Sequence, residues 1–169
     1  DVRGVGPLAD VVCLSARQDG SFPSRLYQPG ECREEARGHG TLDETATRTV
    51  RTVFDADSQP DASLVLGEVI TFPGRWSSYP PHHHLQPEIY HYRFNPPSGF
   101  GYCGLGSRVV RVREGSTVLI PPGRSHPQAA APGYAMWYLW VIRHLPGNPY
   151  GTPTFEPAHA WTLRPGPPE

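Results

Sequence analysis

Three side chains that can ligate a metal lie close together in the sequence, at His82, His84 and Glu88, in the pattern H-x-H-x-x-x-E. Side chains alternate between the two faces of an extended strand, so residues an even number of positions apart project to the same side. If the backbone stays extended, these three side chains converge on one ion. A third imidazole, His126, is expected to arrive from a neighbouring strand. Three imidazole nitrogens and one carboxylate oxygen suit a divalent transition metal.

The residues around these ligands make the pattern specific. A run of histidines is weak evidence by itself, because solvated histidine tracts look similar. However, the spacing G-x5-P-x-G-x2-H from Gly115 to His126 matches the second cupin motif, and the H-x-H-x3-E pattern matches the first. The chain therefore resembles the cupins. This resemblance implies an all-β fold, an antiparallel jelly-roll barrel whose mouth holds a ligand. A vestigial site that has lost its metal is the alternative.

The composition fits such a barrel. A chain of 169 residues suits one domain with a core, or one domain plus a short arm. Its 18 glycines and 21 prolines, together with its aromatic residues, indicate many short strands joined by turns, with few helices. A net charge of −1 gives no nucleic-acid footprint. No apolar run approaches the ~18 residues of a membrane helix. We therefore expect no nucleic-acid and no membrane partner.

The cysteines suggest a compartment. Cys13, Cys32 and Cys103 lack the spacing of a metal or redox site. An odd number of cysteines without a signal-like leader favours a reducing cytoplasm over secretion. Because the chain begins with Asp1 rather than Met, we expect it to be processed or cut from something longer.

Alternating or apolar runs between turn residues predict the strands of the barrel. The run 63–72 is almost continuously apolar and is expected to be covered on both faces. We expect an irregular N-terminal arm or a remnant of a preceding unit at 1–36, the cupin domain at 37–163 and a tail at 164–169. The Pro-rich C-terminal segment is expected to have one anchor near Phe155 and Trp161. Strands are expected at 47–54, 63–72, 88–94, 100–106, 108–113, 117–120 and 133–142.

Strand parity also sorts the side chains around Glu88. If Glu88 faces the metal, Tyr90 and Tyr92 line the cavity, although both could instead be core aromatics with satisfied hydroxyls. His91 and Arg93 fall on the opposite face, so His91 is not expected to be a ligand. Surface or packing roles are expected for the remaining histidines without metal-like neighbours, His39, His144 and His159.

Longer stretches resemble one family. They are W-S-S-Y-P-P-H-x-H ending at His84, E-I-Y-x-Y-R-F-N-P-P-x-G-F ending at Phe100, and V-L-I-P-P-G-x-x-H-P ending at Pro127. These stretches are similar to the bacterial 5-deoxy-glucuronate isomerases of inositol breakdown and, more distantly, to the related uronate isomerases of pectin breakdown. The similarity runs from about Arg37 to Trp161. Family members look like two cupin units in one chain, and this chain has room only for the second.

The resemblance implies an intramolecular aldose–ketose isomerisation of 5-deoxy-glucuronate to 5-dehydro-2-deoxy-gluconate, with a sugar acid as the partner. It implies one divalent metal, zinc or manganese first, with iron or nickel as alternatives. A homo-oligomer is a further expectation. Arg93 could pair with the substrate carboxylate if its strand twists. The implied metal ligands are His82, His84, Glu88 and His126. The candidate catalytic residues are Tyr90, Tyr92 and Tyr134, and the candidate substrate-binding residues are Tyr79 and Arg93.

The sequence departs from the family near the expected substrate. Cys103 and Gly104 replace a Gln-Arg pair, and Trp140 replaces an Asn on the closing strand. His83 and Leu85 replace a Lys and an acidic residue beside the ligands. These changes predict an intact metal site with impaired or substrate-shifted activity.

Two other functions fit the same ligands. A metal-dependent cupin dioxygenase would bind iron and oxygen through the same three histidines and one glutamate. A non-catalytic sugar-acid-binding cupin would keep the pocket and bind its ligand without turnover.

Overall fold

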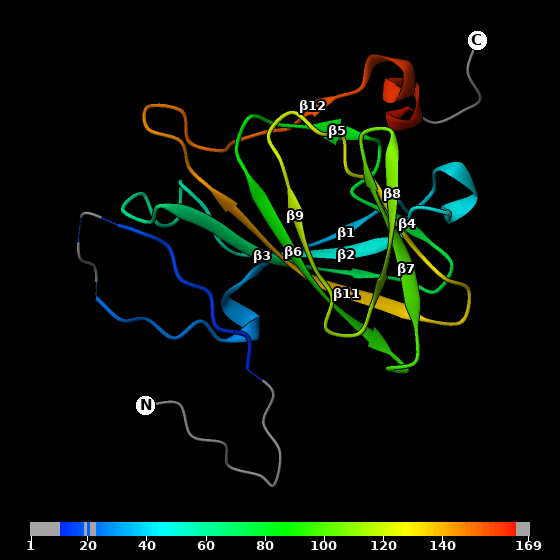
Figure 1. Cartoon of the computed structure of the whole chain (residues 1–169), viewed down its shortest axis with the longest axis horizontal. Helices are drawn as coiled ribbons and strands as arrows, with labels where there is room; N and C mark the ends of the chain where they lie inside the picture. Colours follow the sequence, from blue (N-terminus) through cyan, green and yellow to red (C-terminus); the bar gives the residue numbers. More distant parts are fainter. Residues whose placement is uncertain (1–10, 19, 21–22, 165–169) are drawn as a thin grey trace, which may run out of the picture.

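The computed structural model describes residues 11–18, 20 and 23–164, and its regular elements are almost all β-strands (Figure 1). The larger sheet has six antiparallel strands in the order β1-β2-β3-β11-β6-β9. Neighbours in this sheet are mostly distant in sequence, as expected for a jelly roll. The all-β prediction is confirmed. The strands of this sheet are β1 (Arg33–Arg37), β2 (Arg48–Phe54), β3 (Leu64–Thr71), β11 (Ala135–Arg143), β6 (Glu88–Asn95) and β9 (Thr117–Ile120).

A smaller sheet of four strands faces the larger one, in the order β4-β10-β7-β8. Its strands are β4 (Trp76–Ser77), β10 (Gln128–Ala130), β7 (Phe100–Leu105) and β8 (Arg108–Arg113). A third pair, β12 (Thr154–Phe155) with β5 (His82–His83), lies at the end of the barrel where the candidate ligands are found. The helices are short 3-10 turns: η1 (Pro29–Glu31), η2 (Leu42–Glu44) and η3 (Pro157–Leu163).

The core lies between the two sheets. Along β2, β3 and β6 every second residue is buried, which is the period of a strand with one face on a core. The larger sheet supplies most of the bulk, including Tyr92 and Met136, and Cys103 and Val112 cover it from the smaller sheet.

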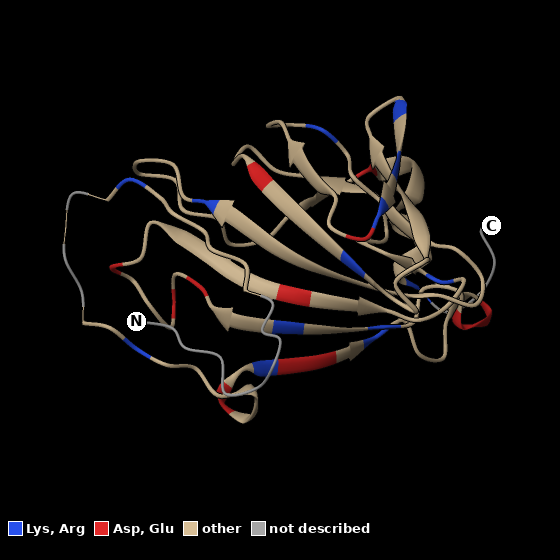
Figure 2. Cartoon of the chain, turned by 60° about the horizontal axis from the view of Figure 1, so that its bottom comes forward, with Lys and Arg blue, Asp and Glu red and all other residues tan. Residues whose placement is uncertain are grey.

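The outer face of the larger sheet is only half covered. On β3 the outward residues are partly exposed, so the prediction of two covered faces is wrong. Charged residues form bands across β1, β2 and β3 (Figure 2), where Arg51 bonds both Glu34 and Glu68. Trp137 on β11 donates its indole N–H to the same Glu68 at 2.7 Å. These polar contacts connect β1, β2, β3 and β11 on a face that no other sheet or helix of the described residues covers.

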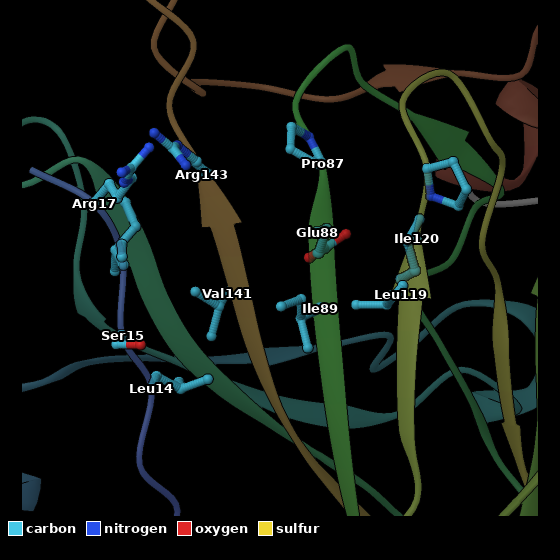
Figure 3. A pocket seen from close by; sticks show the side chains of 13 residues that line it. Leu14, Ser15, Arg17, Pro87, Glu88, Ile89, Leu119, Ile120, Val141 and Arg143 are labelled. Carbon is cyan, nitrogen blue, oxygen red and sulfur yellow. The ribbon is translucent and has the colours of Figure 1, made fainter.

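An apolar hollow of 650 Å³ lies on the same outer face, over β11, β6 and β9 (Figure 3). Ile89, Leu119 and Val141 form its floor, and the segment from Leu14 to Arg17 lies along one side. The hollow therefore belongs to the outside of the barrel, and Glu88 at the start of β6 is the candidate ligand that also borders it.

The predicted strands match β2, β3, β6, β7, β8, β9 and β11. The prediction missed β1, β4, β5, β10 and β12, most of which have only two or three residues and show no period. β1 lies mostly within the segment assigned to the arm and pairs with β2 along its whole length. The division at residues 36 and 163 remains a prediction, and residues 1–10 and 165–169 lie outside the described part.

Two further features of the described residues bear on the sequence analysis. None of their helices is long and apolar enough to cross a membrane. Cys13, Cys32 and Cys103 are all free thiols.

Candidate metal centre

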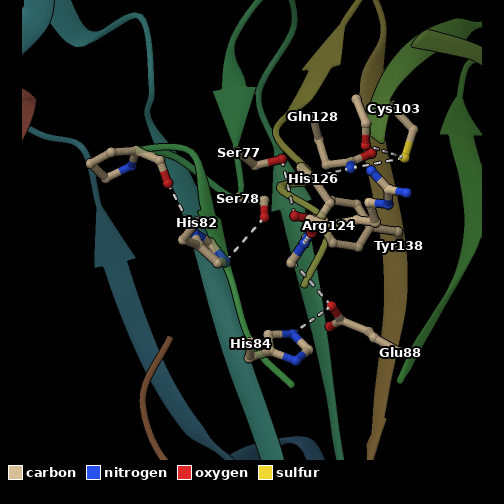
Figure 4. Close-up of polar contacts among 12 residues, drawn as sticks. Ser77, Ser78, His82, His84, Glu88, Cys103, Arg124, His126, Gln128 and Tyr138 are labelled. Atoms are coloured by element: carbon tan, nitrogen blue, oxygen red, sulfur yellow. Dashed lines mark hydrogen bonds and ion pairs between the residues drawn. The ribbon is translucent and has the colours of Figure 1, made fainter. Parts of the chain in front are cut away.

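Three of the four predicted ligands form one buried cluster. Donor atoms of His84, Glu88 and His126 lie within 4.8 Å of one another, and each residue is no more than 8% exposed. Figure 4 shows both imidazoles turned toward the carboxylate. Nε2 of His84 and Nε2 of His126 each lie 3.1 Å from Oε2 of Glu88. The cluster can bind a metal ion.

The chain reaches this arrangement through a loop rather than one extended strand. β5 ends at His83 and β6 begins at Glu88, with non-strand backbone between them. The assumption of a continuous strand is therefore wrong. The N–H of Gly123 donates to the carbonyl of His84 at 2.8 Å, which ties the loop to the turn that carries His126. Pairing of Glu88 with Ile120 places β6 beside β9, the strand before that turn.

The hydrogen bonds of His126 suggest what belongs at the centre of the cluster. Its Nδ1 lies 2.8 Å from the carbonyl oxygen of Arg124, so this nitrogen is the donor. The contact between Nε2 and Glu88 does not have the geometry of a hydrogen bond. Nε2 therefore either carries a second proton or directs its lone pair at the carboxylate. Two acceptors at this distance repel each other unless a cation lies between them. A carbonyl that fixes the outer nitrogen of a histidine is also typical of metal sites.

His84 has a related feature on its other ring nitrogen, since its Nε2 is hydrogen-bonded to Glu88 at 3.1 Å. Its Nδ1 is buried without a hydrogen-bond partner among the described residues, although buried polar atoms are nearly always bonded. A second nitrogen, Nε2 of His126, is in the same state. Imidazole nitrogens and a carboxylate oxygen are ligands for zinc and similar ions. The residues present therefore fit a divalent metal.

His82 lies at the edge of the cluster rather than inside it. Its ring is 4.9 Å from that of His126, between ring centres. Nδ1 lies 2.9 Å from the carbonyl oxygen of Pro80, and Nε2 lies 3.3 Å from Oγ of Ser78. With Nδ1 as donor, Nε2 is the acceptor for the hydroxyl of Ser78. Burial, reinforced by His126, lowers the pKa of His82 to about 4, so the ring is neutral near pH 7.

The cluster shifts the titration of its own members. Burial alone would disfavour the charged form of Glu88, but the adjacent rings of His126 and His84 outweigh it and hold the pKa of this carboxyl below its usual range. Burial likewise opposes charge on His126, yet the carboxylate raises the pKa of the imidazole. A carboxylate that stays ionised when buried is well suited to hold a cation.

A cavity of 750 Å³ opens from the cluster. It is of the size of small-molecule sites, and its walls combine aromatic rings with basic side chains. Tyr150 packs on His84 at 4.9 Å and Phe155 packs on His82 at 5.7 Å, both between ring centres. Burial raises the pKa of Tyr150 to about 12. Other lining residues include Arg33, Glu35, Arg37, His39, Arg48, Tyr79, Tyr90, Tyr138 and Trp140.

The candidate tyrosines separate into two groups. Tyr79 and Tyr90 line the cavity together with the histidines. Tyr92 is fully buried in the core and donates its hydroxyl to Gln128 at 2.8 Å, which matches the core alternative. Tyr134 packs against Phe100 at 6.3 Å between ring centres and is not among the residues that line the cavity.

Other predicted positions lie outside the cavity. Arg93 pairs with Glu114 and is absent from the cavity lining. His91 contacts Thr117 at 2.9 Å, on the outward side of β6. These two placements agree with strand parity, which holds within β6 itself.

The sequence analysis missed several residues of the cavity wall. Tyr150 and Phe155 come from the Pro-rich C-terminal segment, and Arg48 comes from the first residue of β2. Phe155 was identified as an anchor, but not as a neighbour of His82. The alternation of β2 was a usable signal for Arg48, because it puts Arg48 on the same face as the core residue Val50.

The chain is similar to known proteins in sequence. Residues 5–162 match the KduI/IolB family. The chain is 36% identical to a 5-deoxy-glucuronate isomerase of Geobacillus kaustophilus, over 96% of this chain and 62% of that protein. It is 34% identical to the enzyme of the same name from Geobacillus thermodenitrificans, over 96% of this chain and 63% of that protein. The chain thus spans less than two thirds of these curated relatives.

Two solved structures are also similar to this chain. An IolB-like protein from Salmonella typhimurium LT2 superposes with a TM-score of 0.76 at 32% identity, over 86% of this chain and 58% of that chain. A cupin 2 conserved barrel domain protein from Rhodopseudomonas palustris superposes with a TM-score of 0.58 at 18% identity, over 82% of this chain and 88% of that chain. The second likeness concerns the fold alone, and it confirms the cupin barrel.

Proposed function

Because the chain belongs to the KduI/IolB family, we propose that it is a metal-dependent isomerase that converts 5-deoxy-glucuronate to 5-dehydro-2-deoxy-gluconate. One observation carries this proposal. The carboxylate of Glu88 lies between two imidazoles at the bottom of a cavity large enough for a sugar acid. The relatives named for this activity supply the choice of reaction.

His84, Glu88 and His126 would hold the metal, with His82, at the edge of the cluster, as the proposed fourth ligand. Zinc or manganese is the proposed ion, because imidazole and carboxylate ligands suit both. When bound, a divalent ion polarises the carbonyl and hydroxyl oxygens of the substrate and stabilises the negative charge of an enediolate. The protein side chains then orient the sugar and enclose it.

Tyr79 and Tyr90 are the proposed orienting groups, because both line the cavity beside the ligands. A phenol donates a hydrogen bond to a sugar oxygen and fixes which carbon faces the metal. Tyr150 and Phe155 cover the outer sides of two histidines and keep water from the reacting carbons. Isomerisation moves a proton from the carbon beside the aldehyde to the aldehyde carbon, and the hydroxyl proton of the first carbon to the aldehyde oxygen, so shielding the enediolate from bulk water limits side reactions.

Metal analysis combined with proton exchange tests the proposal. The purified chain is analysed for bound metal and then incubated with 5-deoxy-glucuronate in D2O under NMR observation. We expect about one metal ion per chain, ketose product and deuterium beside the carbonyl. Oxygen uptake in place of isomerisation would favour the dioxygenase, and ligand binding without ketose product would favour the non-catalytic cupin.

The same experiment tests whether this chain, which spans less than two thirds of the length of its curated relatives, is sufficient for turnover. Turnover by this chain would show that the residues present suffice. We also propose that the protein works in the cytoplasm, where sugar acids are broken down, and that it forms a homo-oligomer.

A further inference from the structure

Arg48 is a buried cation inside the cavity. It is 8% exposed and lines the same cavity as the metal cluster. Its Nη1 donates to the carbonyl of Ala46 at 2.6 Å and its Nη2 to the carbonyl of Tyr79 at 2.7 Å. A guanidinium has five N–H donors. The remaining donors of Arg48 have no partner among the residues that the structure describes.

The charge of Arg48 is also unbalanced. No carboxylate of the described residues forms an ion pair with it, whereas nearby Arg33 and Arg37 both pair with Glu35. Burial lowers the pKa of Arg48, but a guanidinium remains charged in proteins. Removing an unpaired charge from water is costly. An anion inside the cavity would offset this cost.

A second guanidinium strengthens the positive field. Arg37 is the cross-strand partner of Arg48 and lines the same cavity. Like charges directly opposite each other on a sheet are destabilising, unless an anion shares them. Arg37 is paired with Glu35, which also lines the cavity, so the guanidinium of this pair that has no carboxylate partner among the described residues is that of Arg48.

The position of Arg48 suits a ligand that also reaches the metal cluster. Its guanidinium bonds the carbonyl of Tyr79, and the preceding residue, Ser78, contacts Nε2 of His82. One short segment therefore joins the arginine to the edge of the cluster. A short sugar chain with an oxygen at one end and a carboxylate at the other could contact both.

We propose that Arg48 binds the carboxylate of the sugar acid and selects acids over neutral sugars. This inference rests on the proposed function, because it identifies the group that holds the far end of the same substrate. The guanidinium matches a carboxylate in shape and charge. Arg93, suggested by the sequence for this role, is paired with Glu114 outside the cavity.

The test compares two ligands that differ only at one end. L-gulonate is D-glucuronate with its aldehyde reduced, and D-glucitol has an alcohol in place of the carboxylate. Neither has a carbonyl to isomerise, so binding is measured without turnover, by calorimetry on the metal-loaded full chain. We expect gulonate to bind about 10- to 100-fold more tightly than glucitol, the effect of a charge-assisted hydrogen-bonded pair.

Three variants assign the preference to Arg48. Arg48→Gln should weaken gulonate binding to the level of glucitol and leave glucitol unchanged. Arg48→Lys keeps the charge and should keep part of the preference. Arg108→Gln, at an exposed position on β8, removes the same charge away from the cavity and should behave as wild type. Circular dichroism and metal content confirm that each variant is folded and loaded.

Several results would overturn the proposal. They are no measurable binding of gulonate to the wild type, equal binding of gulonate and glucitol, or equal losses of both ligands in Arg48→Gln. Equal losses of both ligands would mean that Arg48 holds the Tyr79 segment in place rather than binding the carboxylate. If Arg48→Gln does not fold, the wild-type comparison and Arg48→Lys decide.

The outcome is separable from that of the proposed function. A chain that prefers gulonate through Arg48 but forms no ketose product refutes the isomerase and keeps the acid site. A chain that isomerises 5-deoxy-glucuronate without preferring gulonate refutes the role of Arg48 alone.

Discussion

Replacing Glu88 by glutamine should remove most of the stabilisation that a metal gives to this protein. The change keeps the size of the side chain but removes the only carboxylate in the cluster of His84, Glu88 and His126. Glu88 is 4% exposed and lies 3.1 Å from both imidazoles, so no solvent ion can replace its charge. The amide oxygen that remains is a much poorer metal ligand.

The size of the effect follows from linkage. A metal at about 1,000 times its Kd stabilises the folded state by about 4 kcal/mol. For a domain of this length each kcal/mol shifts Tm by about 2–4 °C, so the wild type should gain about 8–16 °C. Changes to groups that merely support ligands cost about 10- to 100-fold in affinity, and losing the ligand itself should cost at least 100-fold. At the same metal concentration Glu88→Gln should then gain no more than about 3–6 °C.

The assay is thermal unfolding with zinc or manganese added to metal-free protein, each variant being compared with its own metal-free form. Glu34→Gln is the matched control, because Glu34 is exposed on β1 and pairs with Arg51 on the outer face. It should keep the full wild-type shift. A wild-type shift in Glu88→Gln would refute the assignment of this cluster as the metal site.

Three further substitutions probe the ligands, the sheet and the core. His84→Ala should abolish retention of metal through gel filtration, measured by elemental analysis, because it removes a buried ligand nitrogen. Gly67→Ala should lower the unfolding free energy by about 1–3 kcal/mol, measured by urea denaturation, since a Cβ there would lie 2.3 Å from an indole carbon of Trp140 and close to backbone. Tyr92→Phe should cost about 1–2 kcal/mol in the same assay and leave metal content unchanged, because it leaves the side-chain amide oxygen of Gln128 without the Tyr92 donor.

Each of these changes has a control of the same chemistry. His91→Ala, on the outward side of β6, should retain metal, and equal retention in His84→Ala would show that the ligand is misassigned. Gly151→Ala has no atom within 4 Å of the added carbon and should be neutral. Tyr102→Phe, at a side chain that is 45% exposed, should also be neutral. Equal stability of Gly67→Ala and Gly151→Ala would argue against close packing at Gly67.

Much of the barrel and its ligands could be predicted because they depend on local patterns. The period of two in β2 and β6 follows from one buried face, so those strands were found within a residue or two. Short strands such as β4 and β10 have too few residues to show a period, and pairing with neighbours alone defines them. Strand alternation correctly predicted that Tyr90 faces the cavity and Arg93 faces outward within β6. It did not apply between His84 and Glu88, because the chain forms a loop there.

The sequence by itself determined the chemistry of the site, because the types of ligand and their spacing around His84, Glu88 and His126 are written in two short motifs. Only the tertiary structure decided what surrounds them. Tyr150 and Arg48 are far from the motifs in sequence and reach the cavity through the pairing of distant strands. The charge of a buried group depends on all of its neighbours in space. That Arg48 is buried without a carboxylate partner among the described residues can therefore be recognised only from the folded barrel.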